Sequence, residues 1–249
     1  MASPPPSASQ QNPTTPLGAP PGAPPEEAPT GAAKAALEWV QDGMTLGLGT
    51  GRAASAFVEA LGARVADGLQ ITGVPTSEAT AKLAEGLGIP LARLEDVGRL
   101  DITFDGADEV DPALNLIKGY GAAMVREKIV AASSEQLVIL IGPEKLVDAI
   151  GERGRLPIEI LPFGEILVRH ELKKLGLDAE LRTDARGETL TTDNGNWILD
   201  AKLVLPLDAV ALESALVQLP GVLGTGFFLG MADAILIGSG EQVDIRKRS

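Results

Sequence analysis

The sequence of 249 residues contains no cysteine and only one histidine, His170. The absence of cysteine excludes disulfides, thiolate catalysis and cysteine-based metal sites. A single histidine excludes metal sites built from several histidines, so a zinc or iron enzyme would have to rely on carboxylates alone. The chemistry of this chain must therefore come from carboxylates, lysines or hydroxyl groups.

The chain is also poor in aromatic residues and in long apolar runs. Aromatic residues make up 3% of the sequence and hydrophobic residues 45%, so aliphatic side chains must fill the core, which favours buried parallel strands. No apolar run approaches the roughly 20 residues needed to cross a bilayer. The first residues lack the charged start and apolar block of a secretory signal. We therefore expect a cytoplasmic protein without membrane contact.

Basic residues are too few to balance the acidic ones. The 21 lysines and arginines against 34 aspartates and glutamates give a formal charge of −13. Affinity for nucleic acid rests largely on cations that neutralise phosphates, so nucleic acid is not an expected partner. A small phosphorylated ligand remains compatible, since it needs only a few local cations and backbone amides.

Composition and patterning divide the chain into segments. Residues 1–29 hold ten of the 18 prolines and no aromatic residue, which predicts a disordered tail. From residue 31 onward, short apolar strands alternate with helices, which predicts an α/β fold with a doubly wound, mainly parallel sheet. The strands are expected at 44–48, 69–74, 101–104 and 137–142.

The order of elements changes after about residue 151. Strands are expected at 156–161, 197–203 and near Val222, with helices at 164–175 and 208–216. This order predicts a smaller α+β unit with a ferredoxin-like, split βαβ arrangement. The last apolar run, 234–238, resembles the earlier parallel strands, so we expect it to return to the first sheet. The predicted domains are a Rossmann-like catalytic domain, 30–150 plus 229–249, and an inserted small domain, 151–228.

The segment Gly49-Thr-Gly51-Arg-Ala-Ala54 fits a loose dinucleotide-binding pattern after the first strand. Glycines there let backbone amides approach an anion at a helix N-terminus, which suits sugar phosphates as well as pyrophosphates. No strand-end acid follows about 20 residues later to bind a ribose. The alternative interpretation is a tight turn that needs glycine only for its geometry.

Asp105 and Asp108 follow the strand at 101–104, at the edge where open α/β sheets bind their ligands. Glu109 and Asp111 crowd the same loop, and repulsion between carboxylates would raise pKa values and suit acid–base work. The alternative is a solvated acidic turn, and Asp111 is most simply a turn residue because a proline follows it.

Glu127 lies between two cations in a helical segment that is otherwise apolar for a full turn on each side. Consecutive helix positions differ by about 100°, so Arg126, Glu127 and Lys128 cannot all share one solvent-facing stripe. We expect Glu127 to be a partly desolvated base, against the alternative of an exposed glutamate between two cations. Lys118, beside flexible glycines, and Lys145, after a strand, could each hold an anion or be ordinary surface cations.

Two other polar features receive a plainer interpretation. His170 lies among charged neighbours on a predicted helix and is not expected to be catalytic. The segment Thr192-Asp-Asn-Gly195-Asn is interpreted as a tight hairpin turn, because Asn-Gly readily adopts a positive φ.

Taken in order from about residue 31 to the C-terminus, seven blocks resemble type A ribose-5-phosphate isomerase. The blocks are Gly47-Leu-Gly-Thr-Gly51, Asp105-Gly-Ala-Asp-Glu109, Ile117-Lys-Gly-Tyr-Gly121, Arg126-Glu-Lys-Ile-Val-Ala131, Leu156-Pro-Ile-Glu159, Thr192-Asp-Asn-Gly-Asn196 and Pro220-Gly-Val222. The resemblance implies a metal-free, cofactor-free interconversion of ribose 5-phosphate and ribulose 5-phosphate in the non-oxidative pentose phosphate pathway. It also implies a homodimer or homotetramer.

The resemblance further implies a role for each matching residue. Glu127 matches the general base that moves a proton between C2 and C1 through a cis-enediol(ate). Asp105 would assist ring opening, Lys118 would stabilise oxyanion charge, and Asp108 would complete the catalytic set. The implied substrate-binding positions are Thr50, Gly51, Arg52, Ala53, Asp105, Gly106, Ala107, Asp108, Lys118, Gly119, Tyr120, Gly121 and Lys145.

The chain departs from the family pattern in two loops. In the family the glycine loop, residues 47–51 here, is often followed by Ser-Thr, but this chain has Arg52-Ala53. In the lysine loop, residues 118–121, Tyr120 stands where the family frequently has a glycine. We expect Arg52 to supply a compensating charge. Rival interpretations are sugar-phosphate deaminases, CoA transferases, sugar-sensing regulators and nicotinamide-dependent dehydrogenases. A regulator would normally carry a basic helix-turn-helix segment, which the proline-rich tail does not supply.

Overall fold

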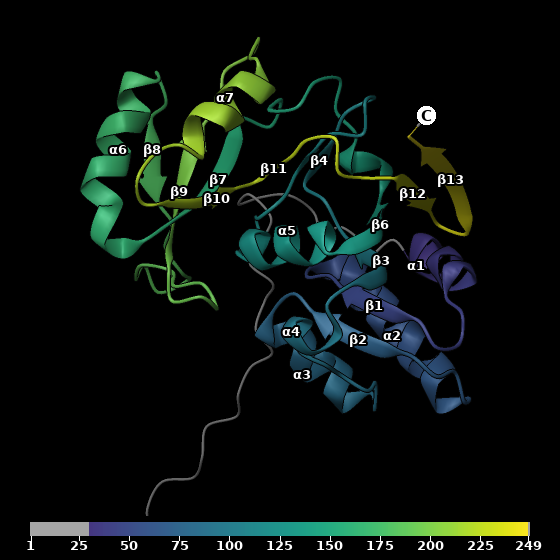
Figure 1. Cartoon of the computed structure of the whole chain (residues 1–249). Helices are drawn as coiled ribbons and strands as arrows, with labels where there is room; N and C mark the ends of the chain where they lie inside the picture. Colours follow the sequence, from purple (N-terminus) through teal and green to yellow (C-terminus); the bar gives the residue numbers. More distant parts are fainter. Residues whose placement is uncertain (1–29, 249) are drawn as a thin grey trace, which may run out of the picture.

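The computed structural model describes residues 30–248 (Figure 1). The predicted disordered tail, 1–29, lies outside the described residues. A six-stranded sheet with strand order β13-β12-β6-β3-β1-β2 forms the centre of the structure. All neighbours in it are parallel except β12 and β13. Its strands are β1 (Thr45–Leu48), β2 (Thr72–Pro75), β3 (Leu100–Asp105), β6 (Ser134–Ile141), β12 (Ala234–Ser239) and β13 (Gln242–Lys247).

Both faces of this sheet are covered, as the aliphatic strands predicted. In β6, Val138 and Leu140 belong to one core cluster, whereas Ile139 and Ile141 belong to another on the opposite face. Side chains alternate between faces along a strand, so a strand buried on both sides must be apolar throughout. The accompanying helices are α1 (Thr30–Ala36), η1 (Leu37–Trp39), α2 (Arg52–Ala66), α3 (Glu78–Gly86), α4 (Leu94–Val97) and α5 (Met124–Ala132).

A second sheet is antiparallel and follows the predicted ferredoxin-like order. Along the chain its elements run strand, helix, strand, strand, helix, strand, and the strands are ordered β10-β7-β9-β8 in space. The strand at β8 was not predicted. The elements are β7 (Arg155–Ile160), η3 (Pro162–Gly164), α6 (Glu165–Lys174), β8 (Ala179–Leu181), β9 (Trp197–Lys202), α7 (Ala209–Leu216) and β10 (Val222–Thr225).

A third, three-stranded sheet with order β11-β5-β4 was also not predicted. Its strands have only two residues each, too short for a periodic pattern to reveal them. Lys118 follows β5 directly, so this sheet fixes where the lysine loop begins. The strands are β4 (Glu109–Val110), β5 (Leu116–Ile117) and β11 (Phe227–Phe228), and one further 3-10 turn, η2 (Pro143–Lys145), follows β6.

The final apolar run returns to the first sheet. Ala234 to Ile237 pair in parallel with Val138 to Ile141, so this strand prediction is confirmed. The division into a catalytic domain and an inserted domain at 151–228 stays a prediction. In Figure 1, α5 lies between the two larger sheets, and it contacts β3 and β6 on one side and β10 on the other. None of the helices within residues 30–248 is long and apolar enough to span a membrane.

Candidate active site

The order of the parallel strands places several loops at one edge of the sheet. From β1 the chain moves outward to β2 and then returns past β1 to β3, so the direction of winding reverses between β1 and β3. Ligands of open α/β sheets bind at such a reversal, beyond the carboxyl ends of the strands. The glycine loop after β1 and the acidic loop after β3 therefore meet there, where Gly49 N donates to Phe104 O at 2.9 Å.

Gly49 and Gly51 are required at this junction for different reasons. A Cβ at Gly49 would collide with the Asp105 carboxyl group, so only glycine allows the two loops to approach this closely. Gly51 has φ 101°, a conformation that favours glycine, and it precedes the first turn of α2 without a side-chain cap. The N–H groups of that turn are therefore not capped by the side chain before them.

Lys118 is the centre of the site. Its Nζ lies 3.0 Å from Asp105 Oδ2 and 3.2 Å from Glu127 Oε2, and it donates to Gly106 O at 2.5 Å. The side chains of Lys118, Asp105 and Glu127 are exposed by only 3%, 1% and 4%. Ions buried this deeply are stable only when they are paired and hydrogen bonded. The alternative that Lys118 is a surface cation is therefore wrong.

Asp105 connects the loops around this lysine. Its Oδ1 accepts hydrogen bonds from Thr50 N at 3.2 Å and Gly106 N at 2.7 Å, while Oδ2 faces Lys118. Burial raises the pKa of Asp105, and the Lys118 charge and the two amides oppose that rise. The carboxylate is thus held from both sides in one orientation.

Asp108 is held less tightly. Its Oδ2 accepts a hydrogen bond from Tyr120 N at 3.0 Å. Burial raises the pKa of Asp108, although the Tyr120 amide and the charges of Lys118, Lys145 and Arg182 lower it. The charge of Lys145 thus acts on the acidic loop, and its contact with a bound anion stays a prediction.

Glu127 lies in the first turn of α5 and points toward Lys118. Its Oε2 lies 3.2 Å from the Lys118 ammonium, and no neutral group among the described residues donates to it. The carboxylate is therefore held by the lysine charge, without a neutral donor on this oxygen. Burial first, and then repulsion by Asp105, raise the pKa of Glu127 to about 8. A carboxylate of this kind is a stronger base than an ordinary glutamate.

The neighbouring charges of α5 face away from this centre. Arg126 donates from Nε to Asn194 Oδ1 at 2.7 Å, and Lys128 Nζ pairs with Glu213 Oε1 at 3.1 Å. The prediction that at least one of the three charges faces protein is confirmed, because Glu127 is buried. Burial lowers the pKa of Lys118, but the carboxylates of Asp105 and Glu127 outweigh it and raise that pKa, so Lys118 remains charged.

The two other acids of the acidic loop serve the structure. Glu109 is fully buried and accepts hydrogen bonds from Gly151 N at 2.7 Å and Arg153 N at 3.0 Å. Asp111 Oδ1 accepts from Ala113 N and Asn115 N, both at 2.9 Å, as expected for a turn residue. We expected these two acids to act on the site through repulsion, but both instead accept hydrogen bonds from backbone N–H groups. Burial raises the pKa of Glu109.

The other predicted positions lie in the loops around Lys118, except for His170. A Cβ at Gly106 would lie 3.7 Å from the Ala53 Cβ, and one at Gly121 would lie 3.9 Å from Thr50 Cγ2, so the three loops converge. His170 is exposed on α6, as expected. The remaining predicted residues lie in three segments, namely the glycine loop and the first turn of α2 (Thr50, Gly51, Arg52 and Ala53), the loop after β3 (Gly106 and Ala107) and the loop after β5 (Gly119, Tyr120 and Gly121).

Sequence reasoning missed a cluster of hydroxyl groups beside the glycine loop. Thr50 Oγ1 lies 2.7 Å from Thr76 Oγ1, 2.8 Å from Ser77 Oγ and 3.3 Å from Thr80 Oγ1. Thr80 Oγ1 also donates to Gly49 O at 2.8 Å. The run Thr76-Ser-Glu-Ala-Thr80 after β2 was the available signal, since Ser and Thr cap helices. These contacts fix the Thr50 side chain on the α3 side of the loop.

A buried arginine was also missed. Arg182 is 6% exposed and donates from Nη1 to the carbonyl oxygens of Gly119, at 2.8 Å, and Tyr120, at 3.2 Å. Its other nitrogens hold Asp200 at 2.9 Å and 2.5 Å. The Arg155 guanidinium lies 4.7 Å from the centre of the Tyr120 ring. The antiparallel sheet thus supports the lysine loop from behind.

Comparisons with known proteins agree with this geometry. The family model for "Ribose 5-phosphate isomerase A (phosphoriboisomerase A)" matches residues 72–242. A ribose-5-phosphate isomerase A from Nitrobacter hamburgensis is 48% identical over 223 residues, which cover 87% of this chain and 96% of that protein.

Solved structures give the same result. A D-ribose-5-phosphate isomerase in complex with phospho-erythronic acid is 39% identical, with a TM-score of 0.85 over 88% of this chain and 97% of that one. The ribose 5-phosphate isomerase A of Methanocaldococcus jannaschii is 38% identical, with a TM-score of 0.83 over the same shares. The chain therefore belongs to the ribose 5-phosphate isomerase A family, whose members interconvert ribose 5-phosphate and ribulose 5-phosphate.

Proposed function

We propose that this chain interconverts ribose 5-phosphate and ribulose 5-phosphate, with Glu127 as the base that moves a proton between C2 and C1. The observation that carries the assignment is the buried Glu127 carboxylate, whose Oε2 faces Lys118 Nζ at 3.2 Å and accepts from no neutral donor among the described residues. A general base works best when its pKa lies near the operating pH, and burial raises the pKa of Glu127 to about 8.

Lys118 supplies the charge that the reaction requires. When Glu127 takes the proton from the sugar it becomes neutral, and the negative charge appears on the oxygen of the enediolate. The Lys118 ammonium therefore faces the Glu127 carboxylate before the proton transfer and the enediolate oxygen after it. The net charge of the buried site does not change. Stabilisation of this kind is strong because the groups are already oriented and water is excluded. No proton has to leave Lys118, whose pKa is raised.

The two aspartates have separate roles in this proposal. Asp105 uses Oδ1 for two backbone amides and Oδ2 for Lys118, so its contribution is to hold the lysine. Asp108 is more exposed than Asp105, and its pKa is raised by burial. We therefore assign Asp108 to the proton transfer that opens the sugar ring, the step that the family resemblance implied for Asp105.

The phosphate is proposed to bind at the first turn of α2. Backbone amides and the helix dipole favour an anion there, and Gly51 leaves that end uncapped. Arg52 stands where the family often has a hydroxyl residue, so we assign it a charge contact with the phosphate. Arg52→Ala should raise the KM for ribose 5-phosphate about tenfold, in line with the loss of a charged contact. An unchanged KM would remove Arg52 from the site.

Assembly and location form a second part of the proposal. We propose a cytoplasmic homodimer or homotetramer, supported by large apolar side chains that the single chain leaves exposed near α6 and α7. Phe163 is 97% exposed, Ile166 81% and Val210 69%. Light scattering coupled to gel filtration gives the mass directly, and a monomer at micromolar concentration would contradict this part alone.

The function is tested by conversion of ribose 5-phosphate to ribulose 5-phosphate in the presence of a chelator, with Glu127→Gln as the control. We expect turnover by the wild type and a loss of about 10² to 10⁴ in kcat in the variant, the usual contribution of a positioned base. A wild type that binds the sugar phosphate without turnover would contradict the proposal, and near-normal turnover by the variant would remove Glu127 as the base.

A further inference from the structure

The loop at residues 192–196 is more than a hairpin turn. Its backbone forms the expected turn, in which Gly195 has φ 77° and its N–H donates to Thr192 O at 2.8 Å. Its side chains, however, converge on Glu159 of β7, which is fully buried. Glu159 Oε1 accepts hydrogen bonds from Thr192 Oγ1 at 3.0 Å, Asn194 Nδ2 at 3.0 Å and Asn196 Nδ2 at 2.9 Å. The loop is therefore fixed to the antiparallel sheet.

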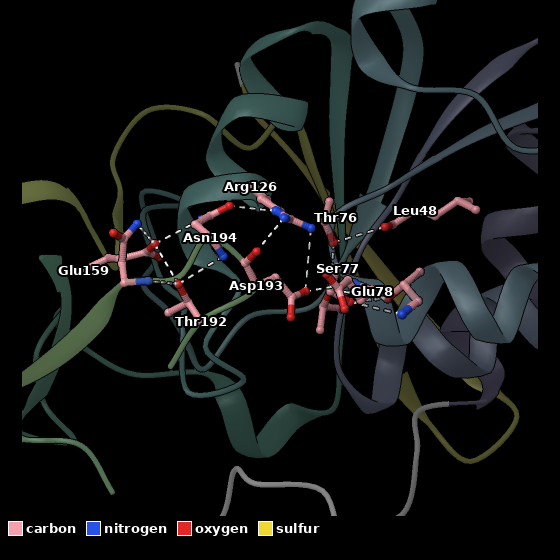
Figure 2. A network of polar contacts seen from close by, with 12 residues as sticks. Leu48, Thr76, Ser77, Glu78, Arg126, Glu159, Thr192, Asp193 and Asn194 are labelled. Carbon is pink, nitrogen blue, oxygen red and sulfur yellow. Dashed lines mark hydrogen bonds and ion pairs between the residues drawn. The ribbon is translucent and has the colours of Figure 1, made fainter. Parts of the chain in front are cut away.

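From its contact with Glu159, the loop extends toward the parallel sheet (Figure 2). Asp193 Oδ2 accepts a hydrogen bond at 2.8 Å from the backbone N–H of Glu78, the first residue of α3. The preceding residue, Ser77, joins the hydroxyl cluster through Thr50 Oγ1 at 2.8 Å. A polar chain thus runs from the loop to the glycine loop of the proposed phosphate site.

The same loop holds α5 through the residue next to the proposed base. Arg126 donates from Nε to Asn194 Oδ1 and from Nη2 to Asp193 O, both at 2.7 Å (Figure 2). Adjacent helix residues point about 100° apart, so a fixed Arg126 side chain determines which way Glu127 faces. On the other flank, Lys128 pairs with Glu213 of α7 at 3.1 Å. Both cations beside Glu127 are therefore bound by elements outside the parallel sheet.

The contacts of Arg126 with the loop depend more on hydrogen-bond geometry than on charge. Arg126 Nη1 and Asp193 Oδ2 are 3.8 Å apart, and their side chains are 36% and 35% exposed, so the ion pair itself contributes little. The two hydrogen bonds from the planar guanidinium are short and oriented, and a lysine cannot reproduce them.

We propose that residues 192–196 and Arg126 form a clasp that positions Glu127 against the glycine loop, which makes Arg126, Asp193 and Asn194 positioning residues of the isomerase reaction. This inference rests on the proposed function. The clasp connects the three parts that must stay in register during catalysis, namely the base on α5, the phosphate site after β1, and α3 beside it.

The test is the steady-state kinetics of Arg126→Ala, Arg126→Lys and Asn194→Ala as full-length proteins. We expect Arg126→Ala to lower kcat about tenfold or more, since small misplacements of a reacting group are costly, and to leave KM within about threefold. Arg126→Lys should not restore the rate. Arg126→Ala combined with Asn194→Ala should lose less than the sum of the two single losses, because both changes remove the hydrogen bond from Arg126 Nε to Asn194 Oδ1.

The pH dependence separates positioning from a general loss of folded enzyme. Lys118, Asp105 and Asp108 are the charged groups that act on Glu127 in the wild type, and Arg126→Ala removes none of them. Water that reaches the loosened carboxylate should reduce the effect of burial, so the acidic limb of kcat/KM should move to lower pH in Arg126→Ala. A smaller folded fraction would lower the rate at every pH without moving that limb.

Arg186→Ala is the matched control. Arg186 also pairs with an aspartate in a turn, with Nη2 3.1 Å from Asp184 Oδ2, but its side chain is 76% exposed. It should have wild-type kinetics. An unchanged kcat in Arg126→Ala, additive losses in the double variant, or an unmoved acidic limb would each overturn the clasp while wild-type turnover still supported the proposed function. A wild type without isomerase activity would instead remove the function on which the clasp rests.

Discussion

Glu127 on α5 and Glu159 on β7 are both buried, and in each of them no neutral group among the described residues donates to Oε2. Their surroundings differ. Three neutral donors converge on Glu159 Oε1, whereas Glu127 faces a lysine and two other carboxylates. Neutral donors that share one oxygen fix a loop, whereas like charges around one cation keep a carboxylate ready to take a proton. The same residue type is thus architectural in one region and reactive in the other.

The two larger sheets differ in the same way. The parallel sheet supplies the reacting groups at its edge, because its strand ends converge at the reversal between β1 and β3. The antiparallel sheet supplies few groups to that edge, yet Arg182 and residues 192–196 hold the lysine loop and α5 in place. Chemistry and positioning are therefore divided between the two regions, and the following variants test that division from the largest expected effect to the smallest.

Lys118→Met should have the largest effect. It leaves Asp105 and Glu127 buried beside each other without a counter-charge, and breaking a buried pair in this way costs about 3–5 kcal/mol. We expect kcat to fall about 10³-fold or more and the free energy of unfolding to fall by that amount at pH 8, as measured by turnover and urea titration. Near-normal turnover with unchanged stability would show that Lys118 is not the centre of the site.

The pH dependence of kcat/KM should show the raised pKa of Glu127. Only the ionised carboxylate can take a proton, so activity should rise with pH until Glu127 is ionised, with an inflection near a pKa of about 8. Below that value the rate should fall about tenfold per pH unit. A rate that stays flat down to pH 5 would mean that the base has the pKa of an ordinary glutamate.

Thr192→Val tests the architectural glutamate. The change removes the hydroxyl that donates to Glu159 at 3.0 Å and keeps the shape of the side chain. We expect the free energy of unfolding to fall by about 1–2 kcal/mol, the usual cost of leaving a buried polar group with fewer partners. The exposed Thr189 provides the control, since Thr189→Val should change stability by less than about 0.5 kcal/mol. Equal effects of the two changes would contradict the role assigned to Glu159.

His170→Ala should have the smallest effect. The side chain is exposed on α6, outside the loops that meet at the sheet edge. We expect kcat/KM within about twofold of the wild type and a change in stability below about 0.5 kcal/mol. A loss of activity greater than tenfold would show that the antiparallel region contributes a reacting group, and would break the division between the two regions.

The sequence predicts the reactive region better than the region that positions it. Asp105, Lys118 and Glu127 lie within 22 positions of one another; strand ends and helix periodicity indicated Asp105 and Glu127 separately, and the family resemblance joined them with Lys118. The partners of the clasp are far apart, since Glu78 and Asp193 are separated by 115 positions and Arg126 and Asn194 by 68. Local patterns carry no information on such contacts, so 192–196 looked like a turn and nothing more.

The residues that the sequence misplaced show the same limit. Glu109 and Asp108 are adjacent, and no local rule separates them, yet β4 turns Glu109 toward Gly151 and Arg153 while Asp108 stays at the sheet edge. β4 has two residues and forms only because β5 pairs with it. Tertiary pairing, absent from any short window of sequence, therefore decides which acid reacts and which caps a backbone.

The most direct test of the account is a side-by-side measurement of kcat and urea midpoint for Glu127→Gln and Glu159→Gln. We predict that Glu127→Gln loses at least 10² in kcat and keeps or gains stability, because a buried charge is removed. We predict that Glu159→Gln keeps kcat within about tenfold and loses stability, because a neutral amide oxygen accepts the three hydrogen bonds more weakly than a carboxylate oxygen does. The reverse pattern, or the same pattern in both variants, would contradict the division of labour between the two glutamates.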